Sequence, residues 1–339
     1  MTGNRPLIAV PMGDPAGIGP EIVLRAAMSA EVAAKCCVIA IGDVRILRRA
    51  LSFPNMPAVE IRAVEKPEDG LYQAGVLNVI DLGNLSPEDY AIGSVDPRCG
   101  RAAYEYIERS IRMAMDGAVD AVSTPPINKE SLHAAGVPYI GHTEIFGALT
   151  GTPDPLTIFE VKNTMVFFLS RHVRLREACD MVTKERLTDY IKRSLAVMEQ
   201  LGVPGGTMAV AGLNPHCGEH GLFGDEEVRE VIPAVEELQK EGYPVVGPIG
   251  ADSVFFQAFE GRYNSVMSLY HDQGHIATKT VDFYRTISIT AGMPVLRTSV
   301  DHGTAFDVAG KGLATSVSME EAILVAAKYA PGFRRSREG

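Results

Sequence analysis

The chain has 339 residues, of which 46% are hydrophobic and 22% are charged, the ordinary composition of a folded globular protein. Its 32 Lys and Arg against 42 Asp and Glu give a formal net charge of −10, which argues against binding to nucleic acid or an anionic membrane. No apolar run approaches the ~18–20 residues of a membrane span. The 5 cysteines include no C-x-x-C pair, so neither a disulfide framework nor a thiolate zinc site is indicated. We therefore expect a cytoplasmic protein.

Short apolar runs alternate with amphipathic segments along the chain. The apolar runs predict strands at 7–10, 38–41, 118–122, 166–169, 207–211, 245–246, 265–269 and 287–290. Apolar residues at helical spacing predict helices at 21–28, 44–51, 101–115, 186–201, 226–240 and 320–328. Such alternation is typical of an α/β fold with a largely parallel sheet.

The length suggests two domains, at roughly 100–200 residues per domain. No Pro-, Gly- or Ser-rich linker divides the chain, so two domains built from discontinuous segments fit the sequence better than two domains in series. We place the first α/β domain at residues 1–133 plus 303–339. The second α/β domain, at residues 134–302, would hold the candidate metal and substrate residues.

The histidines are unevenly distributed, because all 8 lie between His133 and His302. Three of them, His172, His216 and His271, lie in short loops after predicted strands. The carboxyl ends of parallel strands form the ligand crevice of an α/β sheet, so these imidazoles could meet at one metal ion. Three neutral histidines would leave coordination positions open for a substrate. The competing interpretation is that each histidine caps its own loop.

Histidines four residues apart occur twice, at His216/His220 and at His271/His275. On a helix this spacing places both imidazoles on one face, as in the H-E-x-x-H zinc motif. A proline and a glycine oppose a helix in the first segment, and neither segment has Glu directly after its first histidine. We therefore expect His220 and His275 to pack or to face solvent.

Residues able to bind an anion gather in the same part of the chain. His142 and Thr143 open a helix-like stretch, and free N–H groups at a helix N-terminus attract phosphate or carboxylate. Lys279 offers a point charge and Arg297 a bidentate fork for the same groups. A surface ion pair is the alternative interpretation, and it suits Arg285 better than Arg297.

The common nucleotide-binding and nucleophile motifs are missing. The segment 13–19 after the first predicted strand only loosely resembles G-x-G-x-x-G, and Pro20 follows it. No Walker A sequence and no G-x-S-x-G elbow occurs. The sequence therefore gives no support to a Rossmann domain.

Five segments carry a resemblance to a known family: GDPAGIGPE at 13–21, GHTE at 141–144, GLNPH at 212–216, YHDQG at 270–274 and RTSVDHGT at 297–304. With these blocks in order, nearly the whole chain resembles the 4-hydroxythreonine-4-phosphate dehydrogenase family of pyridoxine (vitamin B6) biosynthesis. The resemblance implies a fold similar to that of isocitrate and isopropylmalate dehydrogenases. Such a fold has two α/β domains, a central cleft and NAD bound without a Rossmann fingerprint.

The resemblance also implies particular site residues. The family's metal-binding histidines fall on His172, His216 and His271, and the divalent metal would be Zn, Co or Mg. The family's substrate-binding positions fall on His142, Thr143, Lys279 and Arg297. Asp252 is an acidic candidate for a catalytic role. Members of the family are typically homodimers whose active site draws on both subunits.

One departure from the family pattern concerns the substrate. Ser288 stands where the family usually has Asn, and one hydroxyl cannot make both contacts of an amide. Residues 84–131 resemble a sister branch that acts on D-threonate or D-erythronate 4-phosphate. The substrate therefore stays open between these acids and 4-hydroxythreonine 4-phosphate.

The expected activity is metal-dependent, NAD-linked oxidation and decarboxylation of a 4-phosphorylated four-carbon 3-hydroxy acid. Lys279 would relay a proton, and Arg297 with His142, Thr143 and Ser288 would hold the substrate. The first alternative is a dehydrogenase for a cis-dihydrodiol carboxylate of the terephthalate type. The second is a phosphate-handling transferase or hydrolase that uses no NAD.

Overall fold

The structure is a computed structural model that describes residues 5–203 and 205–338. The chain forms two compact units, the first made of Met1–Pro155 with Ile287–Gly339 and the second of Leu156–Thr286. The predicted α/β class with largely parallel sheets is confirmed, since parallel strands alternate with helices in both units. Each unit is described below by itself.

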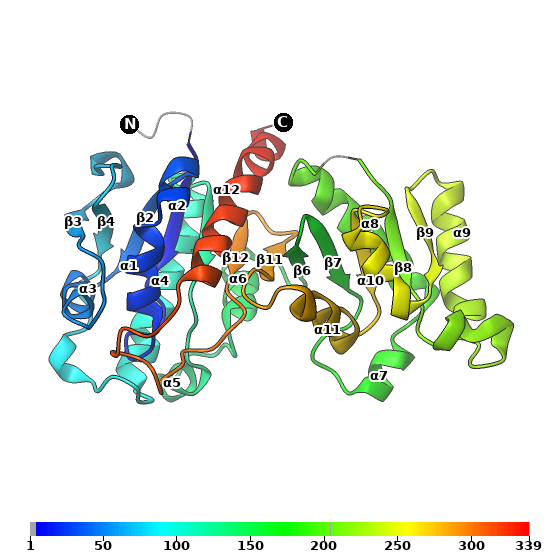
Figure 1. The fold of residues 1–339 in the computed structure, drawn as a ribbon, viewed down its shortest axis with the longest axis horizontal. Helices are drawn as coiled ribbons and strands as arrows, with labels where there is room; N and C mark the ends of the chain where they lie inside the picture. Colours follow the sequence, from blue (N-terminus) through cyan, green and yellow to red (C-terminus); the bar gives the residue numbers. More distant parts are fainter. Residues whose placement is uncertain (1–4, 204, 339) are drawn as a thin grey trace. The chain divides into compact units, whose positions relative to one another are not determined.

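The sheet of unit 1 has the strand order β3-β4-β2-β1-β5-β12-β11 (Figure 1). Its strands are β1 (Leu7–Pro11), β2 (Cys37–Gly42), β3 (Glu60–Val64), β4 (Val76–Asp81), β5 (Ala121–Thr124), β11 (Ile287–Ala291) and β12 (Arg297–Ser299). Neighbouring strands are parallel, except that β11 runs antiparallel to β12. Strand β1 is buried throughout, because a central parallel strand is covered on both faces.

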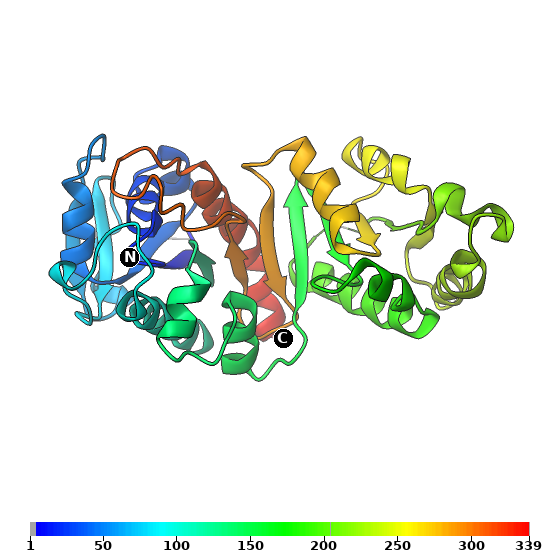
Figure 2. The same cartoon turned by 90° about the horizontal axis from the view of Figure 1, so that it is seen from below.

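Helices pack on both sides of this sheet (Figure 2). They are α1 (Gly19–Ala27), α2 (Ala30–Lys35), α3 (Val44–Leu51), α4 (Pro97–Met115), α5 (Lys129–Ala134), α6 (His142–Thr150) and α12 (Val317–Glu338), with the short turns η1 (Pro67–Asp69) and η2 (Pro87–Asp89). Asp43 and Asp96 begin α3 and α4, because each carboxylate accepts a main-chain N–H of the first turn.

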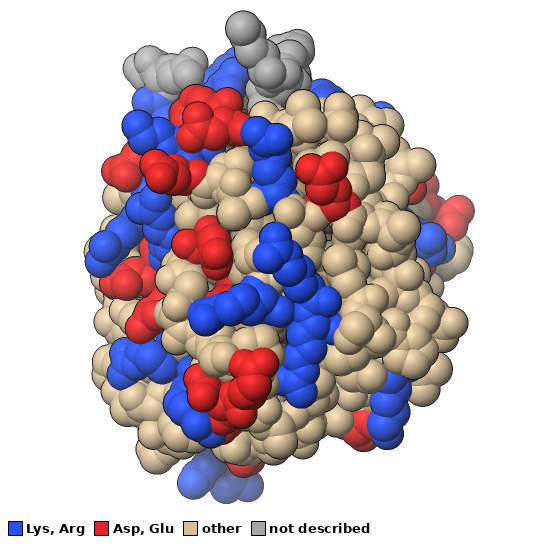
Figure 3. All heavy atoms as spheres, turned by 90° about the vertical axis from the view of Figure 1, so that its left-hand side faces the viewer, with Lys and Arg blue, Asp and Glu red and all other residues tan. Residues whose placement is uncertain are grey.

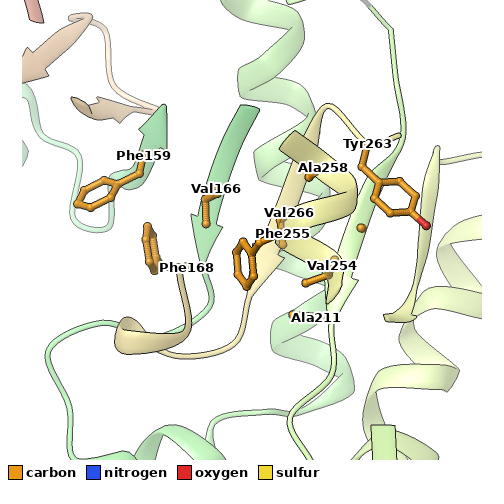
Figure 4. Close-up of a cluster of buried hydrophobic side chains, with 10 residues drawn as sticks. Phe159, Val166, Phe168, Ala211, Val254, Phe255, Ala258, Tyr263 and Val266 are labelled. Carbon is orange, nitrogen blue, oxygen red and sulfur yellow. The ribbon is translucent and has the colours of Figure 1, made fainter. Parts of the chain in front are cut away.

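The sheet of unit 2 has the order β6-β7-β10-β8-β9. Its elements are β6 (Leu156–Val161), β7 (Thr164–Phe168), α7 (Leu175–Asp180), α8 (Lys184–Gln200), β8 (Met208–Ala211), η3 (Pro215–Gly221), η4 (Glu227–Val231), α9 (Ile232–Lys240), β9 (Val245–Ile249), α10 (Ala251–Phe259), β10 (Ser265–Ser268) and α11 (His271–Val281). Only the pair β6–β7 is antiparallel among the paired strands of this unit. Phe159, Phe168 and Phe255 are part of its buried core (Figure 4).

The predicted elements agree with the structure in type, but several bounds differ. Helix α3 matches the predicted 44–51, whereas α12 continues past the predicted end at residue 328 to Glu338. Phe333, two residues after Pro331 in this helix, is buried, so tertiary packing continues the helix beyond its apolar repeat. Strands β3, β4 and β6 were not predicted; β3 is largely exposed and lacks an apolar run, whereas β4 and β6 are mostly buried.

The unit boundaries also differ from the expected ones. The expectation placed them after residues 133 and 302, whereas the structure divides the chain after Pro155 and Thr286. Residues 134–155 and 287–302 thus belong to unit 1. The reason is that β12 pairs with β5, β11 pairs with β12, and α6 packs against α4.

Two surface properties complete the description. No helix in the described ranges is long and apolar enough to cross a membrane. On the face of unit 1 that Figure 3 shows, basic and acidic side chains are intermixed.

Candidate functional site

Arg297, at the start of β12, is the central residue of a candidate anion-binding site in unit 1. The residue is only 4% exposed. Its Nε donates to Oγ1 of Thr124 at 3.1 Å, and its Nη1 donates to Oγ1 of Thr290 at 2.8 Å. Thr290 lies directly opposite Arg297 in the antiparallel pair β11–β12, so both side chains share one face of the sheet. The guanidinium carbon also lies 5.3 Å from the ring centre of Phe146.

The electrostatics of this site favour an anionic ligand. Burial lowers the pKa of Arg297 to about 9, although the charge of Glu144 opposes the shift. Within residues 5–203 and 205–338, no carboxylate forms an ion pair with this guanidinium. A buried charge with hydroxyl partners alone is unfavourable. A bound anion would compensate it.

His142 adds a second polar residue to this candidate site, and one of its ring nitrogens lacks a hydrogen-bond partner. It begins α6, whose first turn has no side-chain cap. The Nε2 atom of His142 is buried and has no hydrogen-bond partner in the described part of the chain. Burial, together with the charges of Arg297 and Lys129, lowers the pKa of His142 well below its usual value. The imidazole is therefore neutral near pH 7 and able to hydrogen-bond a ligand.

Two further predicted substrate residues lie on the same elements. Thr143 is the second residue of α6 and is half-buried. Ser288 lies two residues before Thr290 on β11, so it shares the face that carries Arg297. Lys129, at the start of α5, also belongs to this environment through its charge on His142. Lys129 was not predicted as a site residue, because nothing local in the sequence distinguishes it from a solvated lysine.

The three predicted metal ligands follow neighbouring parallel strands of unit 2. His172 follows β7, His271 opens α11 after β10, and His216 lies in η3 after β8. The strand order β7-β10-β8 places these three strand ends next to one another. This is the sheet edge at which open α/β folds bind ligands.

The structure brings two of these histidines together. The ring centres of His172 and His271 are 5.7 Å apart. Both rings line a cavity of about 240 Å³, with Tyr270 and Asp272 among its other walls. Nδ1 of His271 lies 2.6 Å from Oδ1 of Asp272. A proton on Nδ1 shared with this carboxylate leaves Nε2 available as a metal ligand.

His275 packs beneath His271, one helical turn further along α11. The two rings are stacked with centres 3.8 Å apart. On its other sides His275 contacts Phe159 at 4.2 Å and Phe168 at 4.7 Å between ring centres. Burial is the largest of the causes that lower the pKa of His275 to about 3. The neutral, half-buried ring of His275 therefore supports His271, in agreement with the expected packing role.

Lys279 continues the same face of α11, because residues 271, 275 and 279 are four apart. Its ammonium group lies 5.6 Å from the ring centre of Phe283. Its charge also acts on His275. Lys279 thus lies on the helix face that carries His271.

His216 lies in a left-handed turn. The five residues 216–220 have φ values of 53, 54, 77, 43 and 55°. Each non-glycine residue in this conformation costs ~1–2 kcal/mol. Asp252, the other predicted catalytic residue, is exposed in the first turn of α10. Its charge acts on Cys217 in the left-handed turn, so Asp252 belongs to the surroundings of His216.

A divalent metal fits the donor chemistry, since neutral imidazoles suit Zn and Co. Across the described ranges, however, no group of three or more His, Cys, Asp or Glu side chains is placed to hold a metal. Within one chain, His172 and His271 therefore lie close together, but His216 does not join them in a three-histidine metal site.

Two segments distant in the sequence meet in unit 1 after β1. The N–H of Ile18 donates to the carbonyl of Thr304 at 3.0 Å. The buried carboxylate of Glu21 accepts the N–H groups of Gly310 at 2.6 Å and Gly312 at 3.0 Å. Segments 13–21 and 297–304, which carry part of the family resemblance, thus form one structure near the carboxyl end of a central strand.

Fold and sites together define an α/β protein with polar groups gathered at the carboxyl ends of parallel strands, an arrangement typical of enzymes that bind small ligands. The family model for pyridoxal phosphate biosynthetic protein PdxA matches residues 34–326, and the chain belongs to this family. The predicted family resemblance is confirmed.

The named relatives are dehydrogenases. A Clostridium botulinum protein named "Putative D-threonate 4-phosphate dehydrogenase" is 59% identical over 335 residues, which are 99% of this chain and 100% of the relative. The solved structure of 4-hydroxythreonine-4-phosphate dehydrogenase from Klebsiella pneumoniae is 42% identical, with a TM-score of 0.90 over 96% of this chain and 98% of the other. A terephthalate 1,2-cis-dihydrodiol dehydrogenase from Burkholderia xenovorans LB400 is 26% identical, with a TM-score of 0.67 over 96% and 98%.

Proposed function

We propose that this oxidoreductase carries out metal-dependent, NAD-linked oxidation and decarboxylation of a 4-phosphorylated four-carbon 3-hydroxy acid, with D-threonate 4-phosphate as the first candidate. The observation that carries this proposal is the buried guanidinium of Arg297 beside the unpartnered Nε2 of His142. The choice of D-threonate follows relatives that are 59% identical, against 42% for the 4-hydroxythreonine-4-phosphate dehydrogenase. D-Erythronate 4-phosphate and 4-hydroxythreonine 4-phosphate are the alternative substrates.

The anion-binding site of unit 1 would hold the charged groups of the substrate. Arg297 would bind one anionic group through the guanidinium edge that Thr124 and Thr290 leave open. His142 would donate or accept through Nε2, while Thr143 and Ser288 would hydrogen-bond nearby hydroxyls. This binding would orient the carbon that is oxidised.

A divalent cation, Zn, Co or Mg, would be held by His172, His216 and His271, and it would supply Lewis-acid stabilisation of negative charge on the substrate. Asp272 would keep the ring of His271 in the tautomer that exposes Nε2. Lys279, on the same helix face, would relay a proton at the reacting carbon. Asp252 would act near His216, where its charge already reaches Cys217.

NAD would accept the hydride from the substrate's secondary alcohol. For its binding we propose the joined segments 13–21 and 297–304. They lie after β1, and ligands of open α/β sheets bind beyond the carboxyl ends of strands.

A homodimer with a shared active site would complete the metal centre. Apolar side chains next to His216 are exposed, with Leu222 at 71% and Phe223 at 50%. Leu175, near His172, is 62% exposed. Exposed apolar residues around an incomplete centre are typical of a surface that a second copy covers. His216 of one subunit would then join His172 and His271 of the other.

The test is a panel of 4-phosphorylated four-carbon acids with NAD and NADP, read by absorbance of the reduced nicotinamide. D-Threonate 4-phosphate with NAD should give the highest kcat/KM, and unphosphorylated threonate should be a poor substrate. If none of the acids gives reduced nicotinamide but phosphate is released, the result would favour the transferase or hydrolase alternative.

A cis-dihydrodiol carboxylate is the second candidate substrate, since the fold is shared with the Burkholderia xenovorans dehydrogenase. Its carboxylate would take the place of the phosphate at Arg297. Including terephthalate cis-dihydrodiol in the panel separates the two, because only one class of substrate should reduce NAD rapidly.

A further inference from the structure

His216 lies in a backbone conformation that needs external support. Its φ is 53° and that of Cys217 is 54°, within a run of five residues with positive φ. Residues with a Cβ leave this conformation when nothing holds them, because the Cβ crowds the following carbonyl oxygen. The surrounding fold must therefore hold the turn.

Glu227 holds this turn from one side with a buried carboxylate, since the residue is 0% exposed. Its Oε1 accepts the main-chain N–H of Leu213 at 2.8 Å and of Asn214 at 2.6 Å. Its Oε2 accepts Nδ2 of Asn214 at 2.8 Å. One carboxylate thus fixes the two residues that precede Pro215 and His216.

The same carboxylate meets the turn again at Gly218. A Cβ added at Gly218 would lie 3.0 Å from Oε2 of Glu227 and 2.6 Å from the carbonyl oxygen of Gly224. The φ of Gly218 is +77°, a value that glycine adopts without strain. Glu227 therefore lies against the segment both before and after His216.

We propose that Glu227 is a positioning residue that holds the imidazole of His216 in the orientation required to bind the divalent metal. The inference deepens the proposed function and rests on it, because there His216 is a metal ligand. Hydrogen bonds to a carboxylate are stronger than neutral ones, so three of them suit a group that must hold a strained turn. A purely structural role would instead affect the whole unit equally.

Three substitutions in the full-length protein test this role. Glu227→Ala removes all three acceptor contacts, whereas Glu227→Gln keeps one oxygen for the main-chain N–H groups and sets an NH₂ group against that of Asn214. Glu226→Gln is the matched control, since Glu226 accepts Nδ2 of Asn214 at 2.7 Å without holding the main chain of 213–214. The readouts are Zn²⁺ affinity by calorimetry, melting temperature without metal, and ring signals of ¹⁵N-labelled histidines in the metal-free protein.

We expect Glu227→Ala to weaken Zn²⁺ binding roughly 10–100-fold, the range seen when groups behind metal ligands are removed. In the metal-free protein the ring signals of His216 and of His220, which lies in the same turn, should shift, and those of His172 and His271 should stay. In steady-state assays of Glu227→Ala, the fall in kcat should be larger than the change in KM. Glu227→Gln should weaken Zn²⁺ binding less, by roughly 3–10-fold, and Glu226→Gln should match the unmodified protein.

Unchanged Zn²⁺ affinity in Glu227→Ala, or equal shifts of all three histidine signals with a lower melting temperature, would overturn the inference. If Glu227→Ala does not fold, unchanged Zn²⁺ affinity in Glu227→Gln overturns it. His216→Ala, measured in parallel, separates this failure from that of the proposed function. Normal Zn²⁺ binding by His216→Ala would reject the metal centre itself. If His216→Ala loses Zn²⁺ binding while the Glu227 variants keep it, only the role of Glu227 is rejected.

Discussion

Arg297 and Thr124 are 173 positions apart in the chain, yet Nε of Arg297 donates a 3.1 Å hydrogen bond to Oγ1 of Thr124. The contact exists because β12 lies parallel to β5, with Arg297 aligned to Val122 and Ser299 to Thr124. The late return of the chain to the first unit thus builds the candidate anion-binding site.

Arg297→Met should impair substrate binding without impairing the fold. Loss of a charged, bidentate contact is expected to raise KM for the phosphorylated acid roughly 10–100-fold. Stability should stay the same or rise, because the substitution removes a charge that is unfavourable to bury. Burial lowers the pKa of Arg297 to about 9 for the same reason. Steady-state kinetics and thermal unfolding check both parts. A normal KM would refute the assigned role. The matched control is Arg285→Met, because Arg285 is an exposed arginine of the same chain.

Mixed dimers should recover activity that two single variants lack. His216→Ala and His271→Ala should each be inactive and low in bound metal while keeping their fold. In a random mixture about a quarter of the sites would combine an intact His271 with the intact His216 of the other subunit. The recovery is measured as the activity of the two variants after they are refolded together or co-expressed. No recovery, despite exchange of subunits, would contradict a shared centre.

Chelation should abolish turnover. We expect chelator-treated and dialysed protein to reduce no NAD, and addition of Zn²⁺, Co²⁺ or Mg²⁺ to restore the reaction, because the proposed oxidation needs Lewis-acid stabilisation of charge. Metal content is measured alongside absorbance. Full activity in chelator, with metal shown to be absent, would rule out a metal-assisted step.

Asp14→Asn should change how stability depends on pH. Burial raises the pKa of Asp14 from 3.8 to about 6, partly opposed by the hydrogen bond from the N–H of Ala16. The stability that protonated Asp14 provides is complete below pH 3.8 and is lost as the pH rises through about 6. The variant should therefore match the unmodified protein near pH 4 and exceed it by about 2–3 kcal/mol at pH 7.5.

Urea unfolding at the two pH values measures this difference. The exposed Asp69 provides a control substitution to Asn on the same unit. A stability difference for Asp14→Asn that is identical at both pH values would show that the buried carboxylate does not titrate between them.

Local patterns were sufficient for the α/β class and for most elements. Val44–Leu51 has both an apolar repeat and an Asp cap, so the predicted and observed helices coincide. Strand β3 escaped prediction because an exposed edge strand needs only its neighbour, β4, to form. The unit boundaries differed for a related reason: β12 joins unit 1 by its long-range pairing with β5, and β11 by its pairing with β12, not by any linker.

For the candidate site, position after a strand was enough to select His172 and His271, and residue type was enough to select Arg297. They could not reveal the support behind these residues. His275 beneath His271, the unpartnered Nε2 of His142 and the carboxylate of Glu227 behind His216 depend on distances that the order of residues does not contain.

By itself, then, the sequence determined the fold class, the family and a set of ligand-type residues, because periodicity and short motifs are local properties of the chain. The tertiary structure alone decided that a buried arginine faces two threonine hydroxyls. It likewise decided that His172 approaches His271, and that His216 lies in a left-handed turn held by a buried carboxylate. Burial, desolvation and hydrogen-bond geometry arise only when distant segments pack together, so these properties could not be read from local pattern.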